Sequence, residues 1–325
     1  MNQIATYNER PLEMVVHESP TMGNDFIVAN TEVVTLDHLR NECIVPVFTK
    51  DNEITISHSQ FIDEVYNRVK TCIGNHQISD PSVRVSHVIK GRVPTAIGKS
   101  VKELLDSEKT RYYERCAFSI DVPEIFQIIG GNKVSLSIGG VRAYNQENLY
   151  STKSMEKFKL FIGFKNWVCT NLCISTDGLL DSIKVSSLSE LGEKTVDLIS
   201  NFNADKQLEE MEQLTNYSLN ERQFSLLVGK LRMLPFLDKS KFPEVMNCSL
   251  SESQASTIVK DYHVDEKFCR GENGDISLWS LYNLMTGANK SSYIDRNFQR
   301  NANCFELVKH LGKSLEMNTN SWYLH

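Results

Sequence analysis

The stretch Ile125–Gly140, IFQIIGGNKVSLSIGG, decides the fold class of this chain. Gly130, Gly131 and Asn132 supply the positive φ angles that a tight hairpin turn requires. Runs rich in β-formers lie on both sides of the turn, over residues 110–122 and 133–144. Because a tight turn joins antiparallel strands, we expect an antiparallel sheet to form around this point.

Further strand-like runs extend the predicted sheet in both directions. Residues 83–91, VRVSHVIKG, precede the hairpin, and residues 157–164, KFKLFIGF, follow it. The second run alternates strictly, so one face takes the apolar residues Phe158, Leu160, Ile162 and Phe164, and the other takes Lys157, Lys159 and Lys165. Residues 167–176 fit either another strand or a buried helix. This succession of strands is typical of a meander.

Helical patterns flank the sheet and dominate the end of the chain. Ser57 and Gln60 form a capping box before a helix-spaced apolar stripe over residues 59–73, and a short helix is expected over 100–110. Two more boxes, Ser218–Glu221 and Ser251–Gln254, open helices in the second half. We therefore predict an α+β fold: a central, mainly antiparallel sheet with flanking helices, followed by a helical C-terminal region.

That pattern divides the chain into an α+β part and a helical part. Residues 1–188 hold the sheet, including its basic segment, and residues 189–325 form a helical region that could pack on the same core. Among the 325 residues 41% are hydrophobic, and no apolar run approaches the ~18 residues that a membrane span needs. The N-terminus also lacks the pattern of a secretory signal. We expect a cytoplasmic protein without a membrane partner, with its eight cysteines as reduced, mostly buried thiols.

The charge distribution suggests a polyanionic partner. The chain carries a net charge of −6, but residues 84–165 contain 14 basic and 8 acidic residues, a net charge of +6. Aromatic residues are interleaved with these cations, so phosphate contacts and base stacking could be combined. The candidate nucleic-acid-binding residues are Arg84, Lys90, Arg92, Lys99, Arg111, Tyr113, Arg115, Arg142, Tyr144, Lys157, Lys159, Lys165 and Trp167. The alternative is that the charges are dispersed and the aromatics pack within the sheet.

Catalytic motifs are weak throughout the sequence. Residues 91–100, GRVPTAIGKS, end like a phosphate-binding loop, but Val93 stands where the first glycine belongs and Pro94 removes a backbone N–H. A nucleotide hydrolase using Lys99, Ser100 and Asp121 therefore ranks as the weakest function. Ser86 and His87 are adjacent, and in a regular strand they point to opposite faces. We expect no catalytic site, no cofactor and no metal, and we interpret Cys169 and Cys173 as packing residues.

Several long phrases resemble an uncharacterised protein family of bacterial integrated mobile elements and plasmids. They include residues 56–65, 83–94, 109–125, 135–150, 158–178 and 277–296. The family is distantly similar to a broader phage/plasmid-like family that shares the segment Val168–Asn171. The resemblance implies a cytosolic protein associated with DNA mobility, and no reaction or catalytic residue. We therefore expect a non-catalytic accessory protein that binds nucleic acid, with single strands as the expected form. The alternative is an anti-defence or interaction factor acting through acidic surfaces such as residues 205–212.

Overall fold

The computed structural model describes residues 26–47, 55–147, 155–238, 248 and 250–325. Its main element within these ranges is an eight-stranded antiparallel sheet in the order β1-β3-β4-β5-β6-β7, with β2 also pairing with β3, and β8 with β6. The strands are β1 Glu32–Val34, β2 Val45–Pro46, β3 Ser82–Arg92, β4 Lys109–Ile129, β5 Asn132–Ala143, β6 Glu156–Asn166, β7 Leu172–Cys173 and β8 Leu179–Val185.

The hairpin at the centre of the sheet forms as the sequence predicts. Ile129 and Asn132 are paired in register, so Gly130 and Gly131 alone make the turn. Their φ angles are 53° and 79°, the left-handed values that glycine adopts without a Cβ clash.

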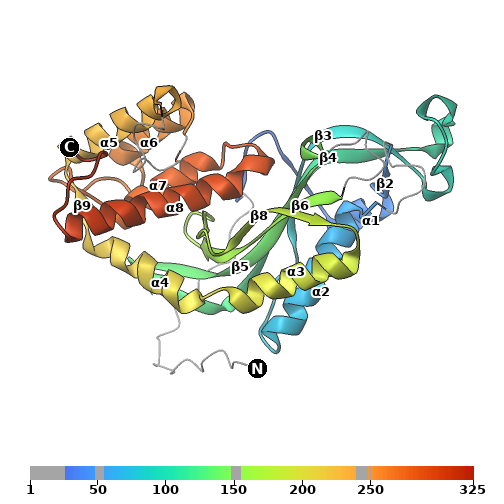
Figure 1. Cartoon of the computed structure of the whole chain (residues 1–325), viewed down its shortest axis with the longest axis horizontal. Coiled ribbons are helices and arrows are strands. Elements are labelled where there is room, and N and C mark those ends of the chain that lie inside the picture. The colour runs from blue at the N-terminus through green and yellow to red at the C-terminus, as the bar shows by residue number, and fades with distance from the viewer. Residues whose placement is uncertain (1–25, 48–54, 148–154, 239–247, 249) are drawn as a thin grey trace.

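Eight α-helices lie in the described part of the chain, most of them after the sheet (Figure 1). They are α1 Leu36–Asn41, α2 His58–Ile73, α3 Leu188–Asn201, α4 Ala204–Gln213, α5 Glu221–Met233, α6 Glu252–Val264, α7 Leu278–Asn289 and α8 Ile294–Glu316. A two-stranded ladder, β9 Ser218–Leu219 with β10 Ile276–Ser277, links the helices. The α+β prediction is confirmed.

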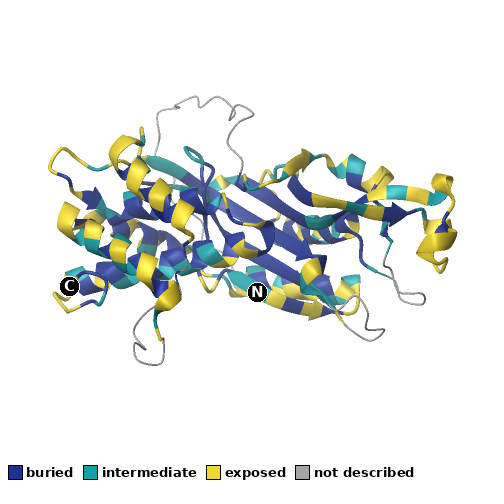
Figure 2. Cartoon of the chain, turned by 90° about the horizontal axis from the view of Figure 1, so that it is seen from above, coloured by how far each residue is buried: buried dark blue, intermediate teal, exposed yellow. Residues whose placement is uncertain are grey.

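The two faces of the sheet are covered by different helices. On one face Phe61 of α2 lies edge-on to Phe118, with ring centroids 5.1 Å apart, and 4.7 Å from Phe158. On the other face Phe298 of α8 lies 4.4 Å from Phe161 of β6. The alternation along β6 is therefore confirmed, but its second face is largely buried too, since α8 packs against Phe161. Figure 2 shows this burial running through the middle of the sheet.

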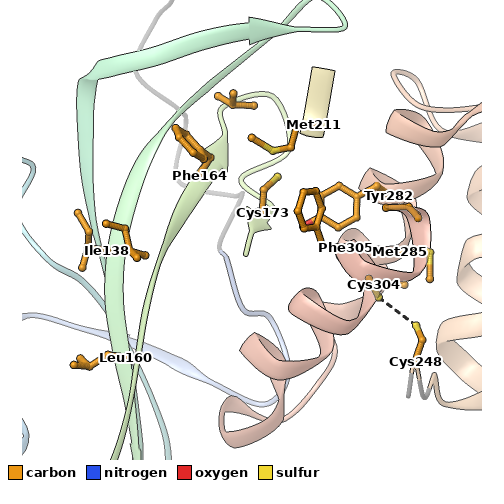
Figure 3. Packing of buried hydrophobic residues seen from close by; sticks show 14 of the residues in the cluster. Ile138, Leu160, Phe164, Cys173, Met211, Cys248, Tyr282, Met285, Cys304 and Phe305 are labelled. Carbon is orange, nitrogen blue, oxygen red and sulfur yellow. Dashed lines mark hydrogen bonds between the residues drawn. The ribbon is translucent and has the colours of Figure 1, made fainter. Parts of the chain in front are cut away.

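Both halves of the chain contribute to one hydrophobic cluster. Figure 3 shows Phe164 and Cys173 of the sheet beside Met211, Tyr282 and Phe305 of the helices. These residues lie on both sides of position 188/189, so the helical region shares the core of the sheet.

Two local predictions need correction, two capping boxes are confirmed, and one open alternative is settled. Ser57 and Ser251 cap α2 and α6 as expected. Helix α5 is capped by Asn220 with Gln223, two residues later than predicted, because Ser218 pairs in the β9–β10 ladder. Within residues 100–110 only two 3-10 turns form, at Val101–Glu103 and Asp106–Glu108, and residues 109–110 already belong to β4, since so short a segment cannot hold an α-helix. Residues 167–176 contain the short strand β7 and no helix.

Candidate nucleic-acid interface

The basic segment of the sequence contains a projecting β-hairpin, which we call the β-arm and define as residues 88–113. Strands β3 and β4 pair with each other along it, whereas the pairing of β4 with β5 begins only at Arg115. Strand β2 supports the outer end of β3 at Gly91 and Arg92. Beyond it lies the arm tip, residues 93–108, which forms the end of the molecule farthest from the helical region (Figure 1).

Three of the thirteen predicted residues are exposed, and all three lie on the β-arm. They are Lys90, Lys99 and Arg111. Lys90 and Arg111 are directly opposite each other in the ladder, an arrangement that is unfavourable for two like charges. Neither forms an ion pair with any residue in the described ranges, whereas Lys99 pairs with Glu108. The arm thus concentrates positive charge that a polyanion would neutralise.

Two exposed lysines of the arm, Lys102 and Lys109, were missed by the sequence analysis. They lie in the segment that was expected to form a short helix, and they count toward the net charge of +6 of residues 84–165. Lys109 lies 2.7 Å from Asp106, and Lys102 has no ion-pair partner among described residues. The arm has six basic and three acidic residues, a net charge of +3, which leaves 29 basic and 38 acidic residues, a net charge of −9, elsewhere.

Arg84 and Arg92 are buried, and their guanidinium groups bond inside the protein. Arg84 donates to Thr31 Oγ1 from Nε at 3.0 Å and from Nη2 at 2.7 Å. Arg92 donates to the carbonyl oxygens of Ala96 at 3.1 Å and of Lys99 at 2.7 Å, and also to that of Val47. Arg92 therefore ties the arm tip to the segment after β2, at the outer end of β3, and is not available to a ligand on the surface.

Arg142 and Tyr144 lie inside the core beneath α2, because the register of β5 turns Arg142 toward that helix. The Arg142 guanidinium is completely buried between Glu147 at 3.3 Å and Glu156 at 2.5 Å, and it stacks 4.2 Å from the centroid of Tyr144. Burial and the nearby Arg142 charge lower the pKa of His58 to about 3, so this histidine is neutral. Burial likewise raises the pKa of Glu156. This cluster is a packed ionic network within the fold.

The remaining predicted residues, Arg115 on β4 and those on or directly after β6, are neutralised or partly covered. Arg115 lies 3.8 Å from both Glu114 and Asp295. Lys159 lies 2.7 Å from Asp181, and Lys165 lies 2.7 Å from Asp121. Lys157 donates to the Gln146 carbonyl oxygen at 2.8 Å, and Trp167 Nε1 donates to Ser135 Oγ at 2.6 Å. These side chains therefore do not join the β-arm in one basic surface.

A cavity of about 330 Å³ opens at the base of the β-arm. Its lining residues are Val28, Asn30, Thr31, Glu32, Ser86, His87, Val88 and Tyr113. Asn30 and His87 hold left-handed backbone, with φ of 39° and 58°, a strain found preferentially at functional sites. Tyr113 is buried, its hydroxyl lies 3.1 Å from His38 Nε2, and burial raises its pKa.

The backbone strain at His87 overturns one expectation. The left-handed residue brings His87 Nδ1 to 3.1 Å from Ser86 Oγ, although neighbours in a regular strand point apart. Glu114 Oε2, at 4.0 Å, and Arg115 Nη1, at 3.4 Å, approach the same ring nitrogen. In a catalytic triad the histidine uses one ring nitrogen toward the nucleophile and the other toward the residue that orients it. Here all three partners approach Nδ1, so the arrangement does not match a catalytic triad.

The groups considered for nucleotide hydrolysis are not brought together. Asp121 lies twelve residues along β4 from Lys109, which corresponds to about 40 Å of strand, whereas Lys99 lies in the arm tip. Asp121 instead accepts from Ser137 Oγ at 2.9 Å and pairs with Lys165. Across the described ranges no group of three or more acidic, histidine or cysteine side chains could hold a metal ion. Cys169 Sγ lies 3.5 Å from Asn283 Oδ1, and Cys173 is buried in the core.

Comparison with known proteins places the chain in a family. A family model described as "Domain of unknown function, B. Theta Gene description" (DUF3871) matches residues 12–324, so the chain belongs to this family. Neither a curated protein nor a solved structure matches the chain. None of the helices in the described segments has the length and apolar character to cross a membrane.

Proposed function

We propose that this DUF3871 member binds nucleic acid through the β-arm, as a non-catalytic accessory protein of a bacterial mobile element in the cytoplasm. The exposed, like-charged pair Lys90 and Arg111 is the observation that carries the proposal. Bound phosphates would neutralise this pair and the neighbouring Lys102, which have no described ion-pair partners. The link to mobile elements rests on the sequence resemblance.

The arrangement of side chains favours a duplex over a single strand. Base stacking needs exposed aromatic faces, but Tyr113 and Tyr144 are buried and Trp167 is partly covered. A projecting β-hairpin is instead a shape that the grooves of a duplex accommodate. The proposal therefore revises the expectation of single-strand binding toward double-stranded DNA.

Titrating the full chain against a labelled duplex of about 30 base pairs tests the proposal. The anisotropy should report binding that weakens as salt rises, because released counterions drive the association. The double variant Lys90→Gln/Arg111→Gln should reduce the slope of log K against log salt concentration by the amount expected for roughly two lost phosphate contacts. The control Lys194→Gln/Lys260→Gln, on α3 and α6, should leave this slope unchanged. No binding at ~50 mM salt with micromolar protein would contradict the proposal.

A second candidate is a protein partner that binds the acidic face of α4. Asp205, Glu209 and Glu212 are exposed there, whereas Glu210 is neutralised by Lys309 at 2.8 Å. Capture of a host replication or defence protein from nuclease-treated extract, abolished by charge-neutral variants of these three residues, would support this candidate. Unchanged capture by the variants would remove it.

A further inference from the structure

The tip of the β-arm carries apolar side chains that nothing in the described structure covers. Ile97, Val101 and Leu105 are 45%, 46% and 62% exposed, and they lie within nine residues. Single exposed apolar residues are ordinary on protein surfaces. Here all three belong to the arm tip, residues 93–108, at the end of the projecting arm that Figure 1 shows.

The arm tip is also fastened by hydrogen bonds and packing. The buried Arg92 guanidinium fastens the carbonyl oxygens of Ala96 and Lys99 to that of Val47. Ala96 and Leu104 pack inward, with 0% and 7% of their surfaces exposed. A group held in this way loses little conformational freedom when it enters a binding partner.

The acidic residues of the tip are used within the tip itself. Glu108 pairs with Lys99 and accepts from the Leu105 amide at 2.9 Å, while Asp106 lies 2.7 Å from Lys109. Glu103 accepts from the Ser100 amide at 3.2 Å. Lys102 follows Val101 in the tip, and Lys90 and Arg111 lie opposite each other in the β3–β4 ladder next to the tip, and none of the three has an ion-pair partner among the described residues. Charge complementarity therefore favours a polyanionic partner, and the apolar side chains favour one that also has an apolar interior.

We propose that the apolar tip is a wedge that inserts between stacked base pairs of duplex DNA and bends it. The inference rests on the proposed function, since the cations of the arm must first hold the phosphates. Ile, Leu and similar side chains that enter the minor groove unstack a base step and bend the duplex by about 20–90°. The fastened tip would present Ile97, Val101 and Leu105 for this insertion without rearranging.

The experiment uses the full chain and a duplex of about 30 base pairs with a fluorescence donor and acceptor at its ends. Wild-type protein should raise the energy-transfer efficiency as it binds, because bending brings the ends together. The variant Ile97→Ser/Val101→Ser/Leu105→Ser should abolish the rise, while its Kd from anisotropy stays within about tenfold of wild type. Phe236→Ser is the matched control, since this side chain is 88% exposed outside the arm, and it should leave both signals unchanged.

The outcomes separate the two proposals. Wild-type binding without a change in energy transfer, or full bending by the triple variant, would overturn the wedge and leave nucleic-acid binding standing. Absence of binding to any duplex would overturn the proposed function itself. If the protein bound anionic lipid vesicles through these same three residues and bound no DNA, the apolar tip would be assigned to a membrane surface instead. A thermal melt that matches wild type would show that the triple variant is folded.

Discussion

Among individual residues, His58 shows most directly how burial changes chemistry. Its ring is completely buried, its Nε2–H donates to the Tyr113 carbonyl oxygen at 2.9 Å, and Nδ1 has no partner among described residues. Burial and the neighbouring Arg142 charge lower its pKa from 6.5 to about 3. The unfolded chain therefore binds one more proton than the folded chain between these two pH values.

This difference predicts a pH-dependent loss of stability. The contribution of neutral His58 is complete above pH 6.5, and it falls by about 1.4 kcal/mol per pH unit as the pH drops toward 3. In urea unfolding, wild type should therefore lose about 2 kcal/mol more than His58→Gln between pH 6.5 and pH 5. His263→Gln, which changes an exposed histidine, should behave like wild type. Parallel curves for wild type and His58→Gln would contradict the assigned neutral state.

Cys248 and Cys304 are a second residue-scale feature that the spacing of the cysteines does not reveal. Their Sγ atoms lie 3.6 Å apart, both side chains are buried, and Asn289 Nδ2 donates to Cys304 Sγ at 3.3 Å (Figure 3). Slow treatment with a small disulfide oxidant should therefore link these two thiols, with release of two reduced oxidant thiols. The new disulfide closes a loop of about 57 residues and should therefore stabilise the fold by about 4 kcal/mol, because it restricts the unfolded chain.

Non-reducing peptide mapping checks the linkage, and urea unfolding checks the stability. In the Cys304→Ser variant, oxidant should produce neither the cross-link nor the gain in stability. The exposed Cys269 should form only a mixed disulfide with the oxidant. If Cys248 and Cys304 stayed unlinked after repeated partial unfolding in the oxidant, the expected disulfide would be contradicted.

At the scale of elements, the β4–β5 turn offers a matched pair of glycines. Both have positive φ, so alanine at either position should cost about 1–2 kcal/mol. A Cβ at position 130 would also lie 2.7 Å from Cδ1 of Trp279, whereas one at 131 meets nothing within 4 Å. Gly130→Ala should therefore lose roughly 1–3 kcal/mol more in urea unfolding than Gly131→Ala. Equal losses would mean that Trp279 does not pack on the turn.

The same turn shows what the sequence can predict about elements. Two consecutive glycines between β-rich runs fix a hairpin by local geometry, and serine followed three residues later by glutamine fixes the caps of α2 and α6. Residues 100–110 were mispredicted because their helix-like pattern is too short to sustain an α-helix, and only Leu104 of the segment is buried. Arg142 was predicted to lie on the surface. The alternation of a strand shows which residues share a face, but not whether another element covers that face, and α2 covers the face of Arg142 in the folded chain.

For the whole molecule, the charge count over residues 84–165 includes the exposed cations of the β-arm, but it cannot distinguish them from buried ones. A sum over residues 84–165 treats Arg142, enclosed between two glutamates, and Lys90, open to solvent, as equal. The difference depends on contacts between segments distant in sequence, such as Lys165 with Asp121. Lys90, Lys99 and Arg111 share the β-arm because they lie on the two strands and the tip of one hairpin. They are close in the sequence, so their proximity can be predicted from it.

The shared core predicts that the chain unfolds as one unit. Trp279 of α7 packs on the β4–β5 turn, and Asn283 accepts from Asn166 at 3.0 Å and from Asn171 at 2.8 Å. A fragment of residues 1–188 would expose Phe161 and the rest of the face that α8 covers. It should therefore be aggregated or lack fixed tertiary structure, because one face of its sheet loses its apolar cover. In the full chain, urea midpoints from far-UV circular dichroism and tryptophan fluorescence should coincide. A folded, soluble fragment or two separated transitions would show that the sheet and the helical region are independent, despite the contacts that join them.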